Sequence, residues 1–150
     1  MEKYNFEDRE QLVEDLLQIL EQGSLNDVKI KLSDGDIIAN KDILMARSDY
    51  FKTMFSNDKF KEGETNTVAM SHSSKAIMGK INKFLFTGAV IFDDLSLAQL
   101  LELSQLSKML LLQKFQDKVN NYIQSYKIQG SGRNVQILPD LISAVKYADH

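Results

Sequence analysis

The chain of 150 residues contains no cysteine and only one proline. Without cysteine it has no disulfide, no thiolate zinc site and no cysteine nucleophile, which fits a reducing compartment. No apolar run exceeds four residues, as in Met109–Leu112, whereas a helix that spans a bilayer needs about 20. The polar start at Met1–Asn5 is unlike a signal peptide. We therefore expect a soluble protein of the cytoplasm or nucleus, with no membrane partner.

The chain also lacks an excess of basic residues. The 18 Lys and Arg and 21 Asp and Glu residues give a net charge of −3, with both signs scattered along the chain. A dedicated nucleic-acid binder usually carries a strong basic excess, so direct binding of nucleic acid is not expected. With 43% hydrophobic residues, a chain of this length can bury a core as one domain.

The sequence has no catalytic constellation. Its histidines are His72 and the terminal His150, and a lone histidine such as His72 is more often a surface or capping residue than a base or ligand. No phosphate-binding glycine loop, His-Glu-x-x-His motif or calcium-loop spacing is present. Asp93-Asp94 and the pair Asp34 and Asp36 suit a helix start and a turn better than acid–base catalysis. We expect no enzyme activity, no cofactor and no metal.

Residues Phe6–Gln22 have the periodicity of an amphipathic helix, which Asn5 can cap and Gly23 can end. Five apolar residues form one stripe along it: Leu12, Val13, Leu16, Leu17 and Leu20. The helix must cover this stripe either on its own domain or on a partner subunit.

The apolar period then changes to two. Alternation over Val28–Leu32 predicts a half-buried strand, Asp34-Gly35 a hairpin turn, and Ile37–Ala39 the partner strand. Thr67–Met70 is a third short strand, and Ala89–Ile91 is a brief extended piece.

Helical spacing dominates the rest of the chain. Lys41–Phe55 predicts a helix in two pieces, with Ser48 capping the second. Another helix contains Ile77 to Leu85 and ends at Thr87-Gly88. A leucine-rich pair of helices begins at Asp94 or Ser96 and reaches about Tyr126, and Gln129–Gly132 follows as a linker. Early strands and late helices favour an α+β domain with a small sheet.

Four sequence segments between Leu25 and Ile123 follow one another in a specific order. They are Asp27–Leu32, Ile38–Phe55, Phe84-Leu85-Phe86-Thr87-Gly88 and Leu100–Leu112. Together they resemble the BTB/POZ domain signature, which has a strand opening with Asp-Val, a Leu-Ala-x-x-Ser motif, a Tyr-Ile-Tyr-Thr-Gly motif and paired C-terminal helices. Asn40 departs from this pattern, because the family usually has histidine there. The resemblance implies an α+β fold: a small mixed sheet of short strands with five to seven α-helices and a helix-rich C-terminal half.

The resemblance also implies a division of the chain. Residues 1–24 would form a dimerisation helix, 25–126 the BTB/POZ core, and 127–150 a linker and the start of a C-terminal helical extension. The segment Leu141–Asp149, in a helix expected from Leu138, is similar to the opening of the BACK-like extension that follows BTB domains in adaptors. Six residues are expected in the core: Val28, Ile30, Leu44, Phe51, Met54 and Phe55.

The implied function is a homodimeric substrate adaptor of a cullin-3 ubiquitin ligase. Such a module is not itself an enzyme; it binds the N-terminal region of cullin-3 and brings in an unidentified substrate through other domains. The leucine stripe of Phe6–Gln22 would form the dimer interface. Asp27 and Lys41 match a charged pocket at the dimer centre of co-repressor-recruiting relatives. We favour the simpler interpretation, in which Asp27 caps the strand start and Lys41 is solvated.

Two stretches are candidates for the cullin surface. The polar stretch Lys59-Phe60-Lys61-Glu62 resembles the hydrophobic-x-Glu motif of cullin-3 adaptors, so Lys59, Phe60 and Glu62 are assigned to that site. The bend between the C-terminal helices adds Leu106, Met109 and Leu110, since Leu103–Leu112 has more apolar residues than one buried stripe needs.

Three other functions use the same core. A BTB dimerisation and co-repressor-recruiting module of a transcription regulator is the main alternative. A Skp-like or elongin-C-like adaptor fits less well, because the N-terminal helix and the position of Phe60 and Glu62 argue against it. A potassium-channel tetramerisation domain would form tetramers instead of dimers.

Overall fold

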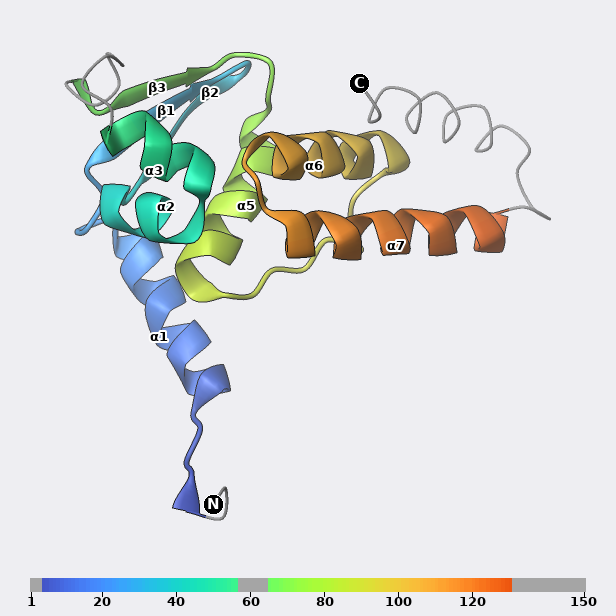
Figure 1. The fold of residues 1–150 in the computed structure, drawn as a ribbon, viewed down its shortest axis with the longest axis horizontal. Helices are drawn as coiled ribbons and strands as arrows, with labels where there is room; N and C mark the ends of the chain where they lie inside the picture. Colours follow the sequence, from blue (N-terminus) through green and yellow to red (C-terminus); the bar gives the residue numbers. More distant parts are fainter. Residues whose placement is uncertain (1–3, 57–64, 131–150) are drawn as a thin grey trace.

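In the computed structural model the described residues are 4–56 and 65–130, with side chains through Tyr126. A small sheet lies at one end, helices lie beneath it, and a helical pair extends to one side (Figure 1). Strand β1 (Val28–Leu32) is central, with β2 (Gly35–Ala39) antiparallel on one edge and β3 (Thr67–Met70) parallel on the other. The predicted mixed sheet of three short strands is confirmed.

The β1–β2 hairpin turns one residue earlier than predicted. Leu32 pairs with Gly35, so Ser33 and Asp34 form the turn and Gly35 opens β2 with a φ of 143°. A Cβ at Gly35 would lie 2.8 Å from Cδ of Lys75, so the position has little room for a side chain. The Asp34 carboxylate accepts a hydrogen bond from the Lys75 backbone N–H at 2.8 Å. This bond ties the hairpin to the helix that starts at Lys75.

The predicted two-piece helix is present as α2 (Lys41–Arg47) and α3 (Asp49–Ser56). Asn40 caps α2: its Oδ1 accepts from the Ile43 N–H at 2.9 Å, and its Nδ2 donates to the Leu25 carbonyl at 2.6 Å. The departure from the family pattern therefore keeps a cap, because asparagine is a strong N-cap residue. Ser48 stands at the joint, where its Oγ accepts from the Phe51 N–H at 3.4 Å.

Three helices complete the described residues. Ser74 caps α5 (Lys75–Thr87), which ends at Gly88 in the left-handed conformation as predicted. Of the two predicted starts for α6 (Leu97–Met109), Ser96 is the correct one, since it forms a capping box with Gln99.

Two smaller expectations are corrected. Helix α7 (Gln113–Gly130) continues through Gln129 and Gly130, which were expected in the linker, and Ala89–Ile91 pairs with no described strand.

The core lies between the sheet and α2, α3, α5, α6 and α7. On β1, Val28, Ile30 and Leu32 are buried and the two lysines between them are exposed, as the alternation predicted. Five of the six expected core residues are buried: Val28, Ile30, Leu44, Phe51 and Phe55. Met54 is half-buried and packs against them. One contiguous core is the expected arrangement for a domain of this size.

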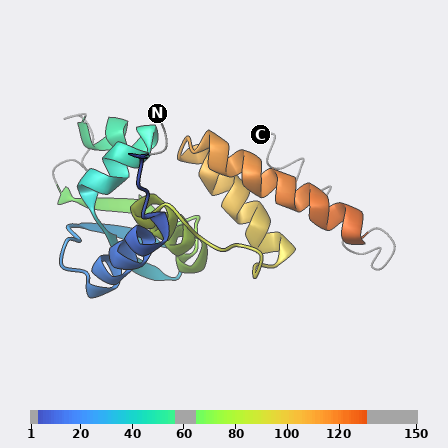
Figure 2. The same cartoon turned by 90° about the horizontal axis from the view of Figure 1, so that it is seen from below.

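Helix α1 (Arg9–Gln22) starts three residues later than predicted. Its N-cap is Asp8 and not Asn5, because Phe6 and Glu7 lie outside the helix. Gly23 ends it in the left-handed conformation, with a φ of 73°. Helix α1 lies beside α5 (Figure 2), and its N-terminal half projects away from the other helices (Figure 1).

Candidate interaction surfaces

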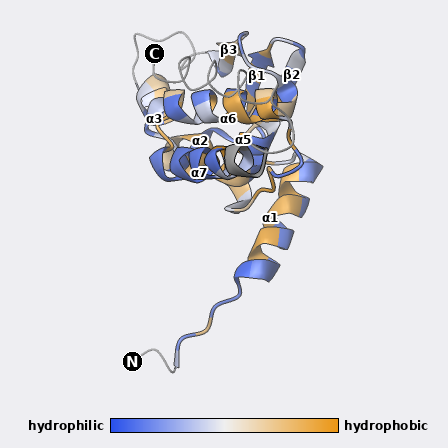
Figure 3. Cartoon of the chain, turned by 90° about the vertical axis from the view of Figure 1, so that its right-hand side faces the viewer, coloured by the Kyte–Doolittle hydropathy of each residue, from blue (hydrophilic) through white to orange (hydrophobic). Residues whose placement is uncertain are grey.

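The leucine stripe of α1 is only partly covered by its own domain. No residue of α1 is buried, and Leu12 is 55% exposed. The other stripe residues, Val13, Leu16, Leu17 and Leu20, are half-buried beside α5. Figure 3 shows apolar residues along the projecting helix. The predicted dimer stripe is thus a half-exposed apolar face.

Asp27 and Lys41 form contacts within one chain. One Asp27 carboxylate oxygen accepts from the Lys41 backbone N–H at 2.8 Å, at the start of α2. The Lys41 ammonium donates to Asn66 Oδ1 at 3.2 Å and lies 5.2 Å from the centroid of the Phe55 ring. The two side chains therefore have separate local roles. Asp27 caps α2 and not the strand start. Lys41 is half-buried, not fully solvated.

Lys59, Phe60 and Glu62 lie outside the described residues. In sequence they follow α3, which ends at Ser56, and precede β3. Their assignment to a cullin surface stays a prediction.

At the bend between α6 and α7, two of the three residues predicted for the cullin surface are buried. Leu106 and Leu110 are 3% and 0% exposed and belong to the core, so they are not available to a partner. They were misassigned because α6 and the turn after it are packed on more than one side. Met109 is half-buried against the same core.

Leu111, which the sequence did not single out, is the exposed leucine of this bend. It is 61% exposed and has a φ of +61°, a conformation that leucine rarely adopts. Hydrogen bonds on both sides hold the turn: Leu111 N–H to the Lys108 carbonyl at 3.1 Å and Leu112 N–H to the Ser107 carbonyl at 2.9 Å. The run of four apolar residues at Met109–Leu112 is the sequence feature that marks this bend. The run alone does not show which of the four side chains faces outward.

The bend is joined to the start of α3. The Ser48 hydroxyl donates to the Leu110 carbonyl at 2.8 Å, and this bond is buried. The end of α6 and the start of α3 are therefore neighbours, although 62 residues separate Ser48 from Leu110. The exposed Leu111 directly follows Leu110 in the chain and is therefore close to the start of α3.

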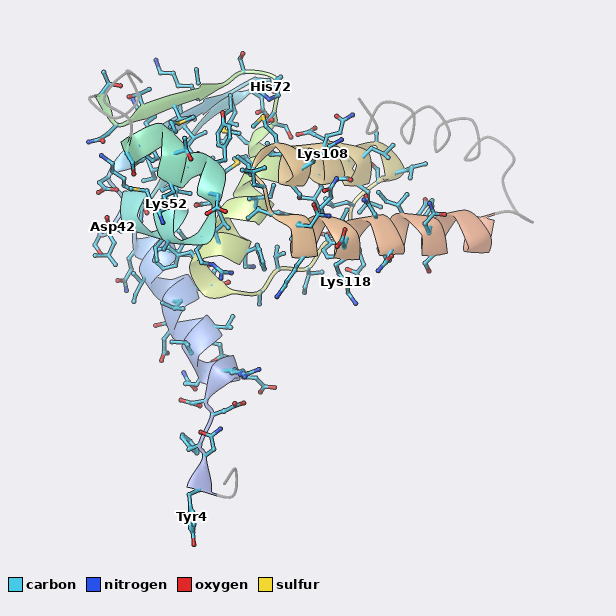
Figure 4. All side chains as sticks on the ribbon, viewed as in Figure 1. Tyr4, Asp42, Lys52, His72, Lys108 and Lys118 are labelled. Atoms are coloured by element: carbon cyan, nitrogen blue, oxygen red, sulfur yellow. The ribbon has the colours of Figure 1, made fainter. Side chains whose placement is uncertain are left out.

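Histidine and carboxylate side chains do not gather into a metal site in the part of the chain that the structure describes. Over residues 4–56 and 65–130 no three His, Asp or Glu side chains are placed to hold a metal ion. In the same ranges no helix is both long and apolar enough to cross a membrane. His72 lies exposed in the turn after β3, at the edge of the molecule (Figure 4).

Comparison with known proteins agrees with this fold. The chain is 34% identical over 71 residues to the human and mouse proteins named Rho-related BTB domain-containing protein 2. That match covers 47% of this chain and about 10% of the length of these relatives.

Solved BTB domains have the same architecture. The BTB domain of human gigaxonin superposes with a TM-score of 0.58 at 18% identity, covering 81% of this chain and 98% of that domain. The BTB domain of zebrafish PATZ1 superposes with a TM-score of 0.62 at 22% identity, covering 82% and 99%. The family profile described as BTB/POZ domain matches residues 16–127. These residues, together with the mixed sheet and the helices around it, show that the chain belongs to the BTB/POZ domain family.

Proposed function

We propose that this chain is the homodimeric interaction module of a substrate adaptor for a cullin-3 ubiquitin ligase. BTB domains typically act as non-catalytic modules that dimerise and bind partners. In the proposed complex, α1 joins two copies, while α3 and the α6–α7 turn face the cullin N-terminal region. A substrate bound by other domains is then held close to the ubiquitin-charged enzyme, and this proximity is the adaptor's contribution.

The observation that carries the proposal is the exposed, left-handed Leu111 beside α3. A left-handed conformation costs a residue other than glycine about 1–2 kcal/mol, and local strain of this kind is often found at functional sites. The sequence that follows α3 contains Phe60 and Glu62 in the hydrophobic-x-Glu arrangement of cullin-3 adaptors. An apolar anchor on the turn and a motif following α3 would together form one partner surface.

The first test is binding of the chain to the N-terminal region of cullin-3. Aromatic anchors dominate interface hot spots, so Phe60→Ala should cost about 2 kcal/mol, which is roughly a thirtyfold rise in Kd. Glu62→Ala should cost about 1–2 kcal/mol, because a charge-assisted hydrogen bond would be lost. Titration calorimetry on the wild type and both variants measures these differences.

Thermal unfolding is the control for these variants. Neither substitution should change the Tm much, because the stretch lies outside the apolar periodicity. No complex with the wild type would reject the adaptor function in favour of the transcription-regulator alternative. Tight binding that is unaffected by Phe60→Ala would keep the function and discard the site.

A second test separates binding from stability at Leu111. Glycine adopts a positive φ without strain, so Leu111→Gly should leave the free energy of unfolding within about 1 kcal/mol of the wild type. Loss of the exposed side chain should raise the Kd for cullin-3 about fivefold to tenfold. Gln113→Ala, at an exposed position two residues away, is the matched control and should bind like the wild type. Unchanged affinity of Leu111→Gly would remove this residue from the proposed surface.

The transcription-regulator module remains the second candidate. It needs the charged pocket at the dimer centre, but in this structure Asp27 and Lys41 each have partners within their own chain. A co-repressor peptide that binds the dimer, and loses affinity in Lys41→Ala, would favour this candidate instead.

A further inference from the structure

The sheet has one covered edge and one open edge. At the β2 edge the buried Asn82 of α5 donates from Nδ2 to the Ile38 carbonyl at 3.5 Å, and α5 lies beside this strand. At the other edge β3 lies along the upper rim of the molecule (Figure 1), and no strand of residues 4–56 and 65–130 pairs with its outer side. A strand with a free edge can accept a further strand from a partner.

The backbone groups at the open edge belong to Thr67 and Ala69. The Lys29 N–H donates to the Asn66 carbonyl at 3.0 Å, across the parallel pairing of β1 with β3. Backbone groups of successive residues point to opposite sides of a strand, so those of Thr67 and Ala69 point away from β1. An added strand can therefore form hydrogen bonds with the N–H and the C=O of both residues.

Strand β3 has none of the features that usually block an open edge. Proteins protect such edges with charged side chains, with proline or with a bulge. The sequence of β3, Thr67-Val68-Ala69-Met70, contains no charged residue and no proline, and its pairing with β1 is regular. The edge is therefore suited to pairing with another strand.

The exposed face of the sheet is cationic beside this edge. Lys29 and Lys31 of β1 are exposed on it, and their partners on β3 are two small residues, Thr67 and Ala69. Asp36 lies opposite Lys31 on β2, but among the described residues neither lysine forms an ion pair. Neighbouring strands lie about 4.8 Å apart, so a strand added beyond β3 would be about 10 Å from β1. Lysine and a long acidic side chain can meet over this distance, because the residues between them are small.

We propose that the open edge of β3 is the docking site for an extended acidic segment of a partner protein. The segment adds a strand beside β3 and forms backbone hydrogen bonds with Thr67 and Ala69. Carboxylates at alternate positions of the segment meet Lys29 and Lys31 on the exposed face. The residues between the carboxylates point to the buried face of β3, where apolar side chains fit. The partner segment thus alternates acidic and apolar residues, and its site is separate from the surface proposed for cullin-3.

A fluorescent peptide of the sequence Ser-Glu-Val-Glu-Val-Glu-Ser tests the site on the whole chain. Fluorescence anisotropy should show saturable binding to the wild type. The double variant Lys29→Glu with Lys31→Glu should raise the Kd about tenfold or more, because attraction becomes repulsion. The matched control, Lys114→Glu with Lys118→Glu, reverses as many charges at exposed positions of α7 and should bind like the wild type. A wild type that does not bind the peptide, or equal losses in both double variants, would overturn the proposal.

Methylation of the peptide nitrogens tests the backbone pairing without any change to the protein. One peptide is methylated at the glutamate nitrogens and another at the valine nitrogens, and both keep all carboxylates. Only one of the two sets faces β3, because backbone groups alternate along the added strand. Methylation of that set should raise the Kd about tenfold or more, and methylation of the other set should have little effect. Equal effects of the two would exclude strand pairing.

Amide hydrogen exchange locates the added strand on the protein. Bound peptide should slow the exchange of the Thr67 and Ala69 N–H groups about tenfold or more, because both become hydrogen-bonded. Binding without this protection would show attachment by charge alone and would overturn the proposal. Protection without peptide that increases with protein concentration would assign the edge to a second copy of the chain, which also overturns it. Binding to cullin-3 should be retained in Lys29→Glu with Lys31→Glu, since these residues are not on α3 or the α6–α7 turn.

Discussion

Replacing Leu12, Leu16 and Leu17 with serine is expected to convert the proposed homodimer into a folded monomer. Losing three apolar anchors from an interface should cost on the order of 4–6 kcal/mol, which raises the dimer Kd by roughly a thousandfold or more. Sedimentation equilibrium over a range of protein concentrations measures the change.

The opposite face of α1 supplies the matched control. Gln11, Glu14 and Gln18 are exposed on the same helix, and replacing them with serine should leave the dimer intact at similar helix content. Circular dichroism shows whether α1 still forms in both triple variants. If the variant without leucines has the wild-type helix content and is still dimeric, α1 is not the interface.

The largest effect on stability is expected at Phe51. Its side chain is 0% exposed, packs edge-on against Tyr50 at 5.5 Å between ring centroids and stacks near Phe55 at 6.1 Å. Phe51→Ala removes most of a buried ring and leaves a cavity, so the free energy of unfolding should fall by about 3–5 kcal/mol. The expected loss is a large part of the roughly 5–15 kcal/mol by which a folded domain is usually more stable than its unfolded chain. Urea unfolding checks this loss, and it is done at one fixed protein concentration because the proposed dimerisation would also contribute to stability.

Thr53 is the control for Phe51. It is exposed on the same helix, and Thr53→Ala should change the free energy of unfolding by less than about 0.5 kcal/mol. A loss below about 1 kcal/mol in Phe51→Ala would contradict the packing of α3 against the core.

Local signals in the sequence predicted most elements of the fold. The alternation in Val28–Leu32 predicts β1, Ser48 separates α2 from α3, and Gly88 ends α5. These signals work because each acts over a few residues, through side-chain periodicity or a cap. The start of α1 was missed by three residues because asparagine and aspartate are both favoured at N-cap positions, and periodicity alone does not choose between Asn5 and Asp8.

The proposed interaction surface was harder to predict. Leu106, Leu110 and Leu111 are the same kind of residue, and the first two are buried while the third is exposed. The difference arises from the left-handed backbone at Leu111, which turns its side chain outward and depends on the packing of the whole helical pair.

The buried bond from Ser48 to the Leu110 carbonyl also has a consequence for the order of folding. It links the two halves of the chain, and contacts between such distant residues form only after the intervening loop has closed. The bond therefore exists only where α3 and the α6–α7 turn have both reached their places in the fold. A partner that binds both elements at once would favour the folded chain over partly folded ones.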